Sequence, residues 1–492
     1  MAGIHLARLT SMTLALSVLA STPAPGQVEG VIRELNNHDA VRGTEKNKAY
    51  KILFDAYLKL DAPPLEVGER FNQNEIHPKM ANWSAVAGWA ESNSEMKEAI
   101  LECRDKLMIG LPYGADEVSA EYREAGLMVD IASGGNLRDN RFPYLDAVDM
   151  IAAYVAAETY RLLEAEQTEP AMDLAVAHIY VLRQFCDRQF LEEKMYNILM
   201  LIDALRNLRD QFYVYRDKIT NEKLVDIAWN EMPFLRPDRN HLFMPEGDRV
   251  IAEALIRSVF DEATGTADEV KFAATFAEIQ AEDEPLTRFG AARRWTLIAR
   301  VHDSLDSSLD RLTLVYDDWW RRWRVQQYDP ILDIPTKFEV TNEVRYAAVV
   351  YSMEDIEELF EIRNLLIAEV NGTAICAALC AYHQVFNAYP EDKVSTYGQF
   401  LRKHYSDFDP FNRVLPTDPT IPVFPYRQLN QRQAIDTPAG RIWVERDEFV
   451  LWALGQDHEN NWAETHTADG SEGDVVIWPP IKAISREQGL LQ

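Results

Sequence analysis

Carboxylates gather in one loop near the C-terminal end of this chain of 492 residues. The loop runs from Gly455 to Asp474, and its acidic residues are Asp457, Glu459, Glu464, Asp469, Glu472 and Asp474. Hard divalent cations such as calcium bind about six to eight oxygen ligands at about 2.3–2.6 Å. The loop therefore indicates a bound ion rather than a reaction, and backbone carbonyls and water would complete the ligand shell.

Two β-like runs flank this acidic loop and would hold it in place. Residues 449–454 form a short apolar run that ends at Gly455, and residues 474–478 are rich in β-branched side chains and stop at Pro479. Both patterns are typical of strands bounded by turn residues, so we expect an antiparallel hairpin.

A second candidate site is the aromatic and basic segment 317–324, which ends a helix predicted over residues 291–325. One hypothesis is that Trp319, Trp320 and Trp323 form a stacking platform for a sugar or a base, with arginines beside it. The alternative is that the three tryptophans continue the apolar stripe of this helix and pack into the core.

Residue types that could do acid–base chemistry are common, but no pattern singles out a catalytic group. The chain lacks a Gly-x-Ser-x-Gly elbow, a His-Glu-x-x-His pair, a Lys-containing phosphate loop and a Cys-x-x-Cys motif. His178 and His302 lie on apolar helices, where core histidines are expected. These observations favour a non-enzymatic protein, and a carboxylate-dependent hydrolase of glycan or peptide is the alternative.

Residues 1–26 have the pattern of a secretory signal peptide. His5 and Arg8 precede the apolar run 12–20, and the small residues that follow would allow cleavage after Gly26. Such a run is too short to anchor the chain across a bilayer core of about 30 Å, and we found no later run of about 20 apolar residues. We therefore expect a periplasmic or extracellular protein that is not inserted in a membrane after signal removal.

Composition limits the classes of partner. Lys plus Arg number 50 against 79 for Asp plus Glu, which gives a formal net charge of −29. Such a surface repels nucleic acid and anionic lipid, but suits divalent cations and leaves a protein or cell-envelope partner open. Cys103 and Cys186 could form a disulfide in an oxidising compartment, and buried free thiols are the alternative that we favour.

Apolar residues recur at three- and four-residue spacing over most of the chain before residue 329. This spacing predicts helices over residues 47–60, 95–108, 145–164, 170–190, 192–210, 248–261 and 291–325. Short breaks join them, so we expect a helical bundle or irregular α-solenoid over residues 27–335. A strand over 338–350, a long helix over 353–387 and the acidic hairpin predict a smaller α+β domain over residues 336–492.

Several motifs of this C-terminal domain come in a recognisable order. The long helix ends at Tyr389-Pro390, and Asp409-Pro410-Phe411, Tyr426-Arg427 and the acidic hairpin follow. This order resembles the globular part of type II secretion major pseudopilins over about residues 362–480. It also resembles exported planctomycete-type proteins in which such a tail follows a long helical region, and that second resemblance implies an architecture but no reaction.

The pseudopilin resemblance implies a calcium site. By this resemblance the backbone oxygen of Leu454 and the side chains of Asp457 and Asp474 would bind the ion, and Asp469 is the best remaining carboxylate. Ala453 stands where the family has Ser, and His458 stands where it has Gly.

Those departures leave two alternatives to calcium open. One is zinc held by His458 and His466 with Asp457 or Asp469, and the other is a solvated acidic loop.

The resemblance does not extend to a fibre subunit. Pseudopilins assemble through an apolar N-terminal helix, whereas here the corresponding helix is internal and acidic at Glu354, Glu357, Glu358 and Glu361. We therefore expect an exported scaffold or binding protein closed by an ion-stabilised pseudopilin-like domain. The alternatives are the hydrolase above and an accessory component of a secretion system.

Overall fold

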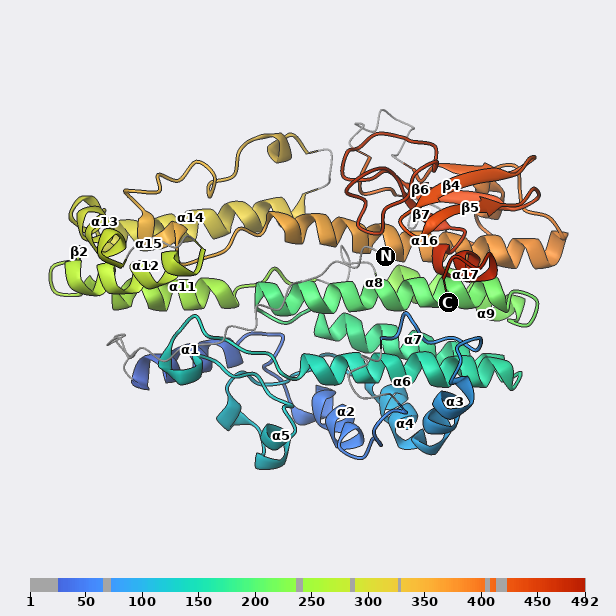
Figure 1. Ribbon diagram of the computed structural model, residues 1–492, viewed down its shortest axis with the longest axis horizontal. Coiled ribbons are helices and arrows are strands. Elements are labelled where there is room, and N and C mark those ends of the chain that lie inside the picture. Colours follow the sequence, from blue (N-terminus) through green and yellow to red (C-terminus); the bar gives the residue numbers. More distant parts are fainter. Residues whose placement is uncertain are drawn as a thin grey trace.

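The computed structural model describes residues 25–64, 72–235, 242–283, 288–325, 329–402, 408–412 and 423–491, with the side chains of Pro25 and of residues 281–283 and 288–289 left out. The predicted signal peptide therefore lies outside the described residues except at its last positions. The molecule is elongated, and its long helices run along the long axis (Figure 1).

The described part of the chain is mainly helical. Its α-helices are α1 Pro25–Asn36, α2 Tyr50–Tyr57, α3 Trp83–Ser92, α4 Ser94–Cys103, α5 Ala120–Glu124, α6 Leu145–Glu164, α7 Thr168–Phe185, α8 Leu191–Val214, α9 Asn221–Asp226, α10 Met232–Leu235, α11 Gly247–Ser258, α12 Glu269–Asp283, α13 Arg288–Val301, α14 Leu305–Arg324, α15 Ala347–Val350, α16 Glu357–Phe386 and α17 Ile481–Glu487. Short 3-10 turns lie at η1 Glu45–Asn47, η2 Ala115–Glu117, η3 Ser133–Gly135, η5 Pro330–Asp333 and η6 Lys393–Thr396, and η4 Ile227–Glu231 is a π-helical turn.

The centre of the molecule is a stack of long helices. α6 packs on α7, α7 on α8, and α8 on α16, so that helices far apart in the sequence lie side by side (Figure 1). The predicted helix over 145–164 is confirmed as α6, and the predicted helix over 192–210 lies within α8. Their three- and four-residue apolar stripes are what the neighbouring helices bury.

Two local predictions are wrong. The helix predicted over 291–325 is broken into α13 and α14, because Ser304 accepts a hydrogen bond from the N–H of Ser307 and starts a new helix. The strand predicted over 338–350 is a turn followed by α15. Oδ1 of Asn342 accepts hydrogen bonds from the N–H groups of Val344 and Arg345 at 3.1 and 2.8 Å. This side-chain turn competes with extended structure, so the segment does not form a strand.

The C-terminal region carries small antiparallel sheets. β3 Tyr426–Gln428, β6 Phe449–Ala453 and β7 Val475–Trp478 form one sheet in the order β3-β6-β7, and β4 Gln433–Thr437 pairs with β5 Gly440–Val444. β1 Phe260–Asp261 and β2 Thr266–Ala267 form a separate short pair between helices. The predicted hairpin of residues 449–454 and 474–478 is confirmed as the pair β6 and β7.

The three-stranded sheet packs directly on α16. A Cβ at Gly372 of α16 would lie 2.5 Å from Cγ2 of Ile477 on β7, so glycine at this position permits the close approach. One hydrophobic cluster runs from α1 through α16 to Trp478, and a smaller one lies between β4, β5 and the outer face of β6. The fold is therefore a mainly α architecture joined to a small α+β region through a shared helix.

By length and hydropathy alone, α16 could span a membrane. The sequence patterns above did not single out this segment as apolar enough to do so. Its most apolar window has a mean hydropathy of 1.6, and 94% of that window is buried inside the protein. Burial on all sides is the behaviour of a central core helix. Cys376 and Cys380 on this helix are buried free thiols, as are Cys103 and Cys186, which confirms the alternative that we favoured for the cysteines.

A buried ionic group ties α6, α7 and α8 to the N-terminal segment. The Glu193 carboxylate accepts hydrogen bonds from Arg188 Nε at 2.6 Å, Tyr144 Oη at 2.6 Å and Tyr113 Oη at 2.9 Å. The side chains of Arg188 and Glu193 are 1% and 0% exposed. We call these four residues the Glu193 cluster.

Candidate functional site

The loop between β6 and β7 folds back tightly on itself. A Cβ at Gly455 would lie 2.0 Å from the carbonyl oxygen of Gly473 and 2.5 Å from that of Gly470, so only glycine allows these backbone segments to touch. This contact brings the start and the end of the acidic loop together at one edge of the sheet.

Asp474 is the central acidic group of the loop. Its side chain is buried, Oδ2 accepts a hydrogen bond from the N–H of Ala463 at 2.7 Å, and Oδ1 is buried without a hydrogen-bond partner among the described residues. Burial raises the pKa of Asp474 to about 6, against the partial effect of nearby backbone N–H groups, and the charge of Asp457 adds to the rise. A buried carboxylate oxygen without a donor is the kind of group that a cation satisfies.

Asp409 is a second buried carboxylate at this place, and our sequence reading did not name it as a site residue. Its oxygens accept hydrogen bonds from the N–H groups of Leu454 and Phe411, both at 3.0 Å. Burial raises the pKa of Asp409 to about 7, and the charge of Asp474 contributes to the rise. The signal in the sequence was the Asp-Pro-Phe motif, which turns out to fasten the end of β6.

The other predicted ligands are placed differently from one another. Leu454 is buried at the end of β6, and the exposed Asp457 lies within electrostatic reach of Asp474. Asp469 instead accepts hydrogen bonds from the N–H and the hydroxyl of Ser471, at 3.1 and 2.8 Å, and its charge acts on Arg206. The structure thus places Asp457 within electrostatic reach of Asp474 and fastens Leu454 to Asp409, while Asp469 is hydrogen-bonded within its own turn.

The histidines of the loop are engaged with the backbone. Nδ1 of the buried His466 accepts a hydrogen bond from the N–H of Val476 at 3.1 Å, and burial lowers the pKa of His466 to about 4. Nδ1 of His458 lies 2.7 Å from the carbonyl oxygen of Phe411. Within the described ranges, no group of three or more His, Cys, Asp or Glu side chains has the geometry of a metal site.

The tryptophans of segment 317–324 lie mostly inside the protein. Trp319 and Trp323 are 1% and 4% exposed, and Trp320 is half-buried. Two of the indole N–H groups donate hydrogen bonds inside the protein. Trp320 donates to Glu246 Oε1 at 2.9 Å, and Trp323 donates to the carbonyl oxygen of Leu242 at 2.8 Å. These contacts make Trp320 and Trp323 structural residues of the α14 interface.

Trp319 also forms one wall of a cavity of about 290 Å³ between α14 and the start of α16. The cavity is lined by Trp319, Arg322, Leu332, Asp333, Ile334, Pro335, Thr336, Glu339, Asp355, Glu357, Phe360, Glu361 and Asn364. Burial raises the pKa of Asp355, and the charge of Glu339 adds to it. The cavity is therefore acidic, with an aromatic wall.

An open groove of about 550 Å³ lies at the other end of α16, and no sequence pattern pointed to it. It is lined by Asn221, Glu222, Val225, Asp226, Trp229, Asn230, Gln399 and Phe400. Trp229 lies on the π-helical turn η4, where the guanidinium of Arg402 sits 5.6 Å from its ring centroid. Extra residues that form π-helical turns are frequent at functional sites.

Comparison of the chain with protein families, with curated proteins and with solved structures finds no match.

Proposed function

We propose that this protein is an exported, non-enzymatic scaffold that binds a protein or cell-envelope partner, with a calcium-stabilised C-terminal domain that resembles type II secretion major pseudopilins. Cleavage after the predicted signal peptide would release it to the periplasm or the outside of the cell. The observation that carries the binding role is the open groove around Trp229. Its aromatic wall and its amide and carboxylate groups suit an extended partner that offers both apolar and hydrogen-bonding surface.

Co-sedimentation with isolated cell envelopes tests the binding role. Wild-type protein should pellet with the envelope fraction, and Trp229→Ala should release at least about tenfold more protein, because aromatic residues dominate the energy of such surfaces. Trp443→Ala is the matched control, since Trp443 on β5 is 37% exposed and lies away from the groove. Equal retention of both variants would overturn the assignment of this groove.

The calcium role is supported by the unpaired, buried Oδ1 of Asp474 beside Asp457. Oxygen ligands from Asp457, Asp474 and the backbone of Leu454 fit the preference of calcium, and the ion would supply the positive charge that these groups lack. At a hundred times its dissociation constant, calcium should stabilise the full-length chain by about 2.7 kcal/mol.

Thermal unfolding in calcium, in zinc and in chelator checks this expectation. Asp474→Ala and Asp457→Ala should abolish the calcium response, whereas Asp469→Ala should keep it because Asp469 is held by Ser471. No calcium response in the wild-type chain, or a response that survives Asp474→Ala, would remove the ion from the proposal and leave the binding role to be judged alone.

A carboxylate-dependent hydrolase of glycan or peptide is the second candidate. The acidic cavity beside Trp319 favours it, since partial burial raises the pKa of Asp355, the direction that suits a general acid. Release of soluble fragments from purified cell-wall glycan or peptide by the wild-type chain, lost in Asp355→Asn, would establish this reading. If the protein is instead an accessory component of a secretion system, it should co-purify with inner-membrane components.

A further inference from the structure

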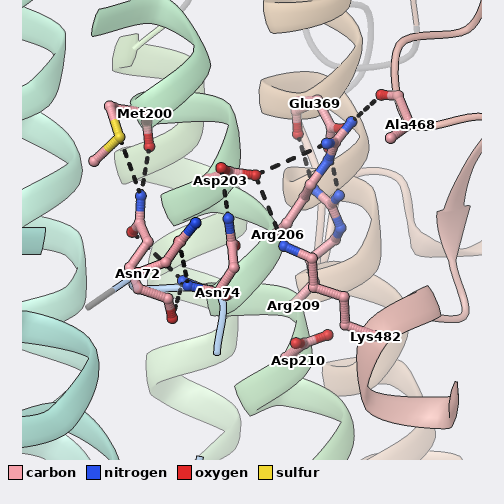
Figure 2. A network of polar contacts seen from close by, with 12 residues as sticks. Asn72, Asn74, Met200, Asp203, Arg206, Arg209, Asp210, Glu369, Ala468 and Lys482 are labelled. Atoms are coloured by element: carbon pink, nitrogen blue, oxygen red, sulfur yellow. Dashed lines mark hydrogen bonds and ion pairs between the residues drawn. The ribbon is translucent and has the colours of Figure 1, made fainter. Parts of the chain in front are cut away.

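A second buried ionic group joins α8 to α16 and to the acidic loop that precedes β7. Figure 2 shows it from close by. Glu369 of α16 accepts a hydrogen bond from Arg206 Nε at 2.7 Å and another from an Nη of Arg209. Arg206 also donates to the carbonyl oxygen of Ala468 at 2.5 Å, and Arg209 donates to Thr373 Oγ1 at 2.6 Å. We call Arg206, Arg209, Glu369 and Thr373 the Glu369 cluster.

A pocket of about 230 Å³ opens against the two arginines of this cluster. It lies between α8, α17, the β4–β5 turn and the loop before β7, and its walls are Arg206, Arg209, Asp210, Thr437, Pro438, Ala439, His466, Ala468, Val476, Ile477, Pro480, Ile481, Lys482 and Leu491. Cationic groups thus occupy one end, and aliphatic side chains form most of the remainder. Its volume is below the roughly 300–1,000 Å³ of pockets for drug-sized ligands, so it suits a small molecule.

Some N–H donors of the cations at this end of the pocket lack a hydrogen-bond acceptor among the described residues. Lys482 Nζ and Arg206 Nη1 lie 3.8 and 3.9 Å from the same Oδ1 of Asp203, which is too far for a hydrogen bond. The other oxygen of Asp203 already accepts a hydrogen bond from Asn74 Nδ2 at 2.6 Å (Figure 2). Lys482 has no closer partner among the described residues, and Nε of the 3% exposed Arg209 is buried and unpaired.

The cations around the pocket are only partly hydrogen-bonded to carboxylates. These cations are Arg206, Arg209 and Lys482 together with Arg486, whose Nη1 lies 3.4 Å from Asp210 Oδ2. The carboxylates that face them are Asp203, Asp210, Glu369 and Asp469, so the formal charges balance, but Asp203 accepts no hydrogen bond from these cations and Asp469 acts on Arg206 through its charge alone. Burial lowers the pKa of Lys482, and the neighbouring Asp203 offsets this effect only in part. An added anion would supply the hydrogen-bond acceptors that Lys482 and Arg209 Nε lack.

We propose that this pocket binds a small carboxylic acid with an apolar body. The carboxylate accepts hydrogen bonds from Lys482 and Arg206, and the apolar body lies against Val476, Ile477 and Ile481. Charge-assisted hydrogen bonds of this kind are about twice as strong as neutral ones, and the aliphatic walls favour an organic acid over a fully hydrated anion such as phosphate. The pocket borders the acidic loop at His466 and Ala468 and shares no lining residue with the groove around Trp229.

Isothermal titration of the full-length chain with benzoate tests the proposal. Benzoate should bind at one saturable site, benzamide should bind at least about tenfold more weakly because it lacks the charge, and acetate should bind more weakly because it lacks the apolar body. Inorganic phosphate should not compete with benzoate. Absence of benzoate binding at millimolar concentration, or equal affinity for benzoate and benzamide, would overturn the proposal.

Two variants locate the binding in this pocket. Lys482→Met should weaken benzoate binding at least about tenfold, because it removes one partner of a charged hydrogen bond. Ala439→Phe, at the half-buried turn between β4 and β5, should block the pocket without changing any charge. Lys218→Met is the control, since Lys218 is 47% exposed and pairs with Glu166 far from the pocket. Benzoate binding that survives both pocket variants would overturn the assignment.

Discussion

α8 carries two buried ionic clusters that use the same chemistry in different surroundings. Near its start, Glu193 pairs with Arg188, and two tyrosine hydroxyls complete the carboxylate's hydrogen bonds. Further along, Arg206 and Arg209 pair with Glu369 of α16, but Arg206 remains 20% exposed and both arginines line a pocket. The first cluster is sealed and the second is open to a small molecule.

The difference lies in what surrounds the cations. In the Glu193 cluster, Nη2 of Arg188 also lacks a hydrogen bond, but the guanidinium stacks 3.9 Å from the ring centroid of Tyr113. In the Glu369 cluster, the equivalent space is a cavity with Lys482 on its wall. A buried ion pair therefore indicates a ligand only where it borders a cavity and a cation without a hydrogen-bonded carboxylate. The Glu193 cluster, which is sealed, is the reference for this comparison.

The largest effect is expected for Glu193→Gln. This change leaves Arg188 buried at 1% exposure without its counter-charge, which should cost about 3–5 kcal/mol of unfolding free energy. Urea unfolding measures it, and Glu166→Gln is the control because the Glu166 side chain is 80% exposed. A loss below about 1 kcal/mol would show that the sealed cluster is not the rigid reference described above.

A smaller loss is expected for Glu369→Gln. Arg206 can turn toward solvent, and Arg209 keeps its hydrogen bond to Thr373, so the cost should be about 1–3 kcal/mol in the same urea assay. A loss as large as that of Glu193→Gln would mean that the open cluster is as tightly sealed as the other.

The pH dependence of the unfolding free energy distinguishes a buried carboxylate without an ion pair, such as Asp409, from one that is paired with arginines, such as Glu369. Burial raises the pKa of Asp409 to about 7 in the folded chain, so the folded state takes up a proton that the unfolded state does not between pH 7 and about 4. In chelator, protonation of Asp409 should therefore contribute about 2–3 kcal/mol to the unfolding free energy as the pH falls from 8 to 5. Denaturant unfolding at several pH values measures this slope, and Asp409→Asn should flatten it.

Glu369 should act with the opposite sign at lower pH. Burial alone would raise its pKa, but Arg206 and Arg209 outweigh burial and hold the pKa below the usual value. Its contribution is therefore complete above about pH 4.5 and is lost as the pH falls through the folded-state pKa. A rise in stability that continued well below pH 4.5 in the wild-type chain, unchanged in Glu369→Gln, would contradict this assignment.

The smallest effect is expected for Lys482→Met without ligand. Lys482 is 29% exposed and meets Asp203 only at 3.8 Å, so its removal should change the unfolding free energy by less than about 0.5 kcal/mol. The same urea assay gives the value. A loss above about 1 kcal/mol would make Lys482 a structural partner of Asp203 and weaken its role as a ligand group.

The parts of the fold that follow from periodicity were predictable. α6 was predicted at its observed bounds, and the β6–β7 hairpin was predicted from two short strand-like runs and from their flanking Gly and Pro residues. The hairpin of β4 and β5 was missed, because Gln433–Thr437 mixes polar and apolar residues and its turn is Pro438-Ala439 rather than a Gly-containing pair. The strand predicted over 338–350 failed because a local Asn342 turn outweighed its alternation.

The ionic clusters and the pockets were beyond the sequence patterns. Charged residues on a helix are usually read as its solvent face, so Arg206 and Arg209 gave no sign of burial. Glu369 offered the one available signal, since it stands alone in the apolar middle of α16. Cavities form where elements distant in sequence meet, and the pocket at Lys482 joins α8 to residues more than two hundred positions away.

The isolated charge in α16 has a consequence for the export that we propose for this chain. A helix with a mean hydropathy of 1.6 competes for lateral transfer into the bilayer while an unfolded chain is threaded through a translocation channel. A charged residue at the centre of a transmembrane segment costs about 2.5–3.5 kcal/mol. Glu369 pairs with two arginines in the folded protein. During the proposed export it would also disfavour arrest of the unfolded chain in the membrane, before those arginines are within reach.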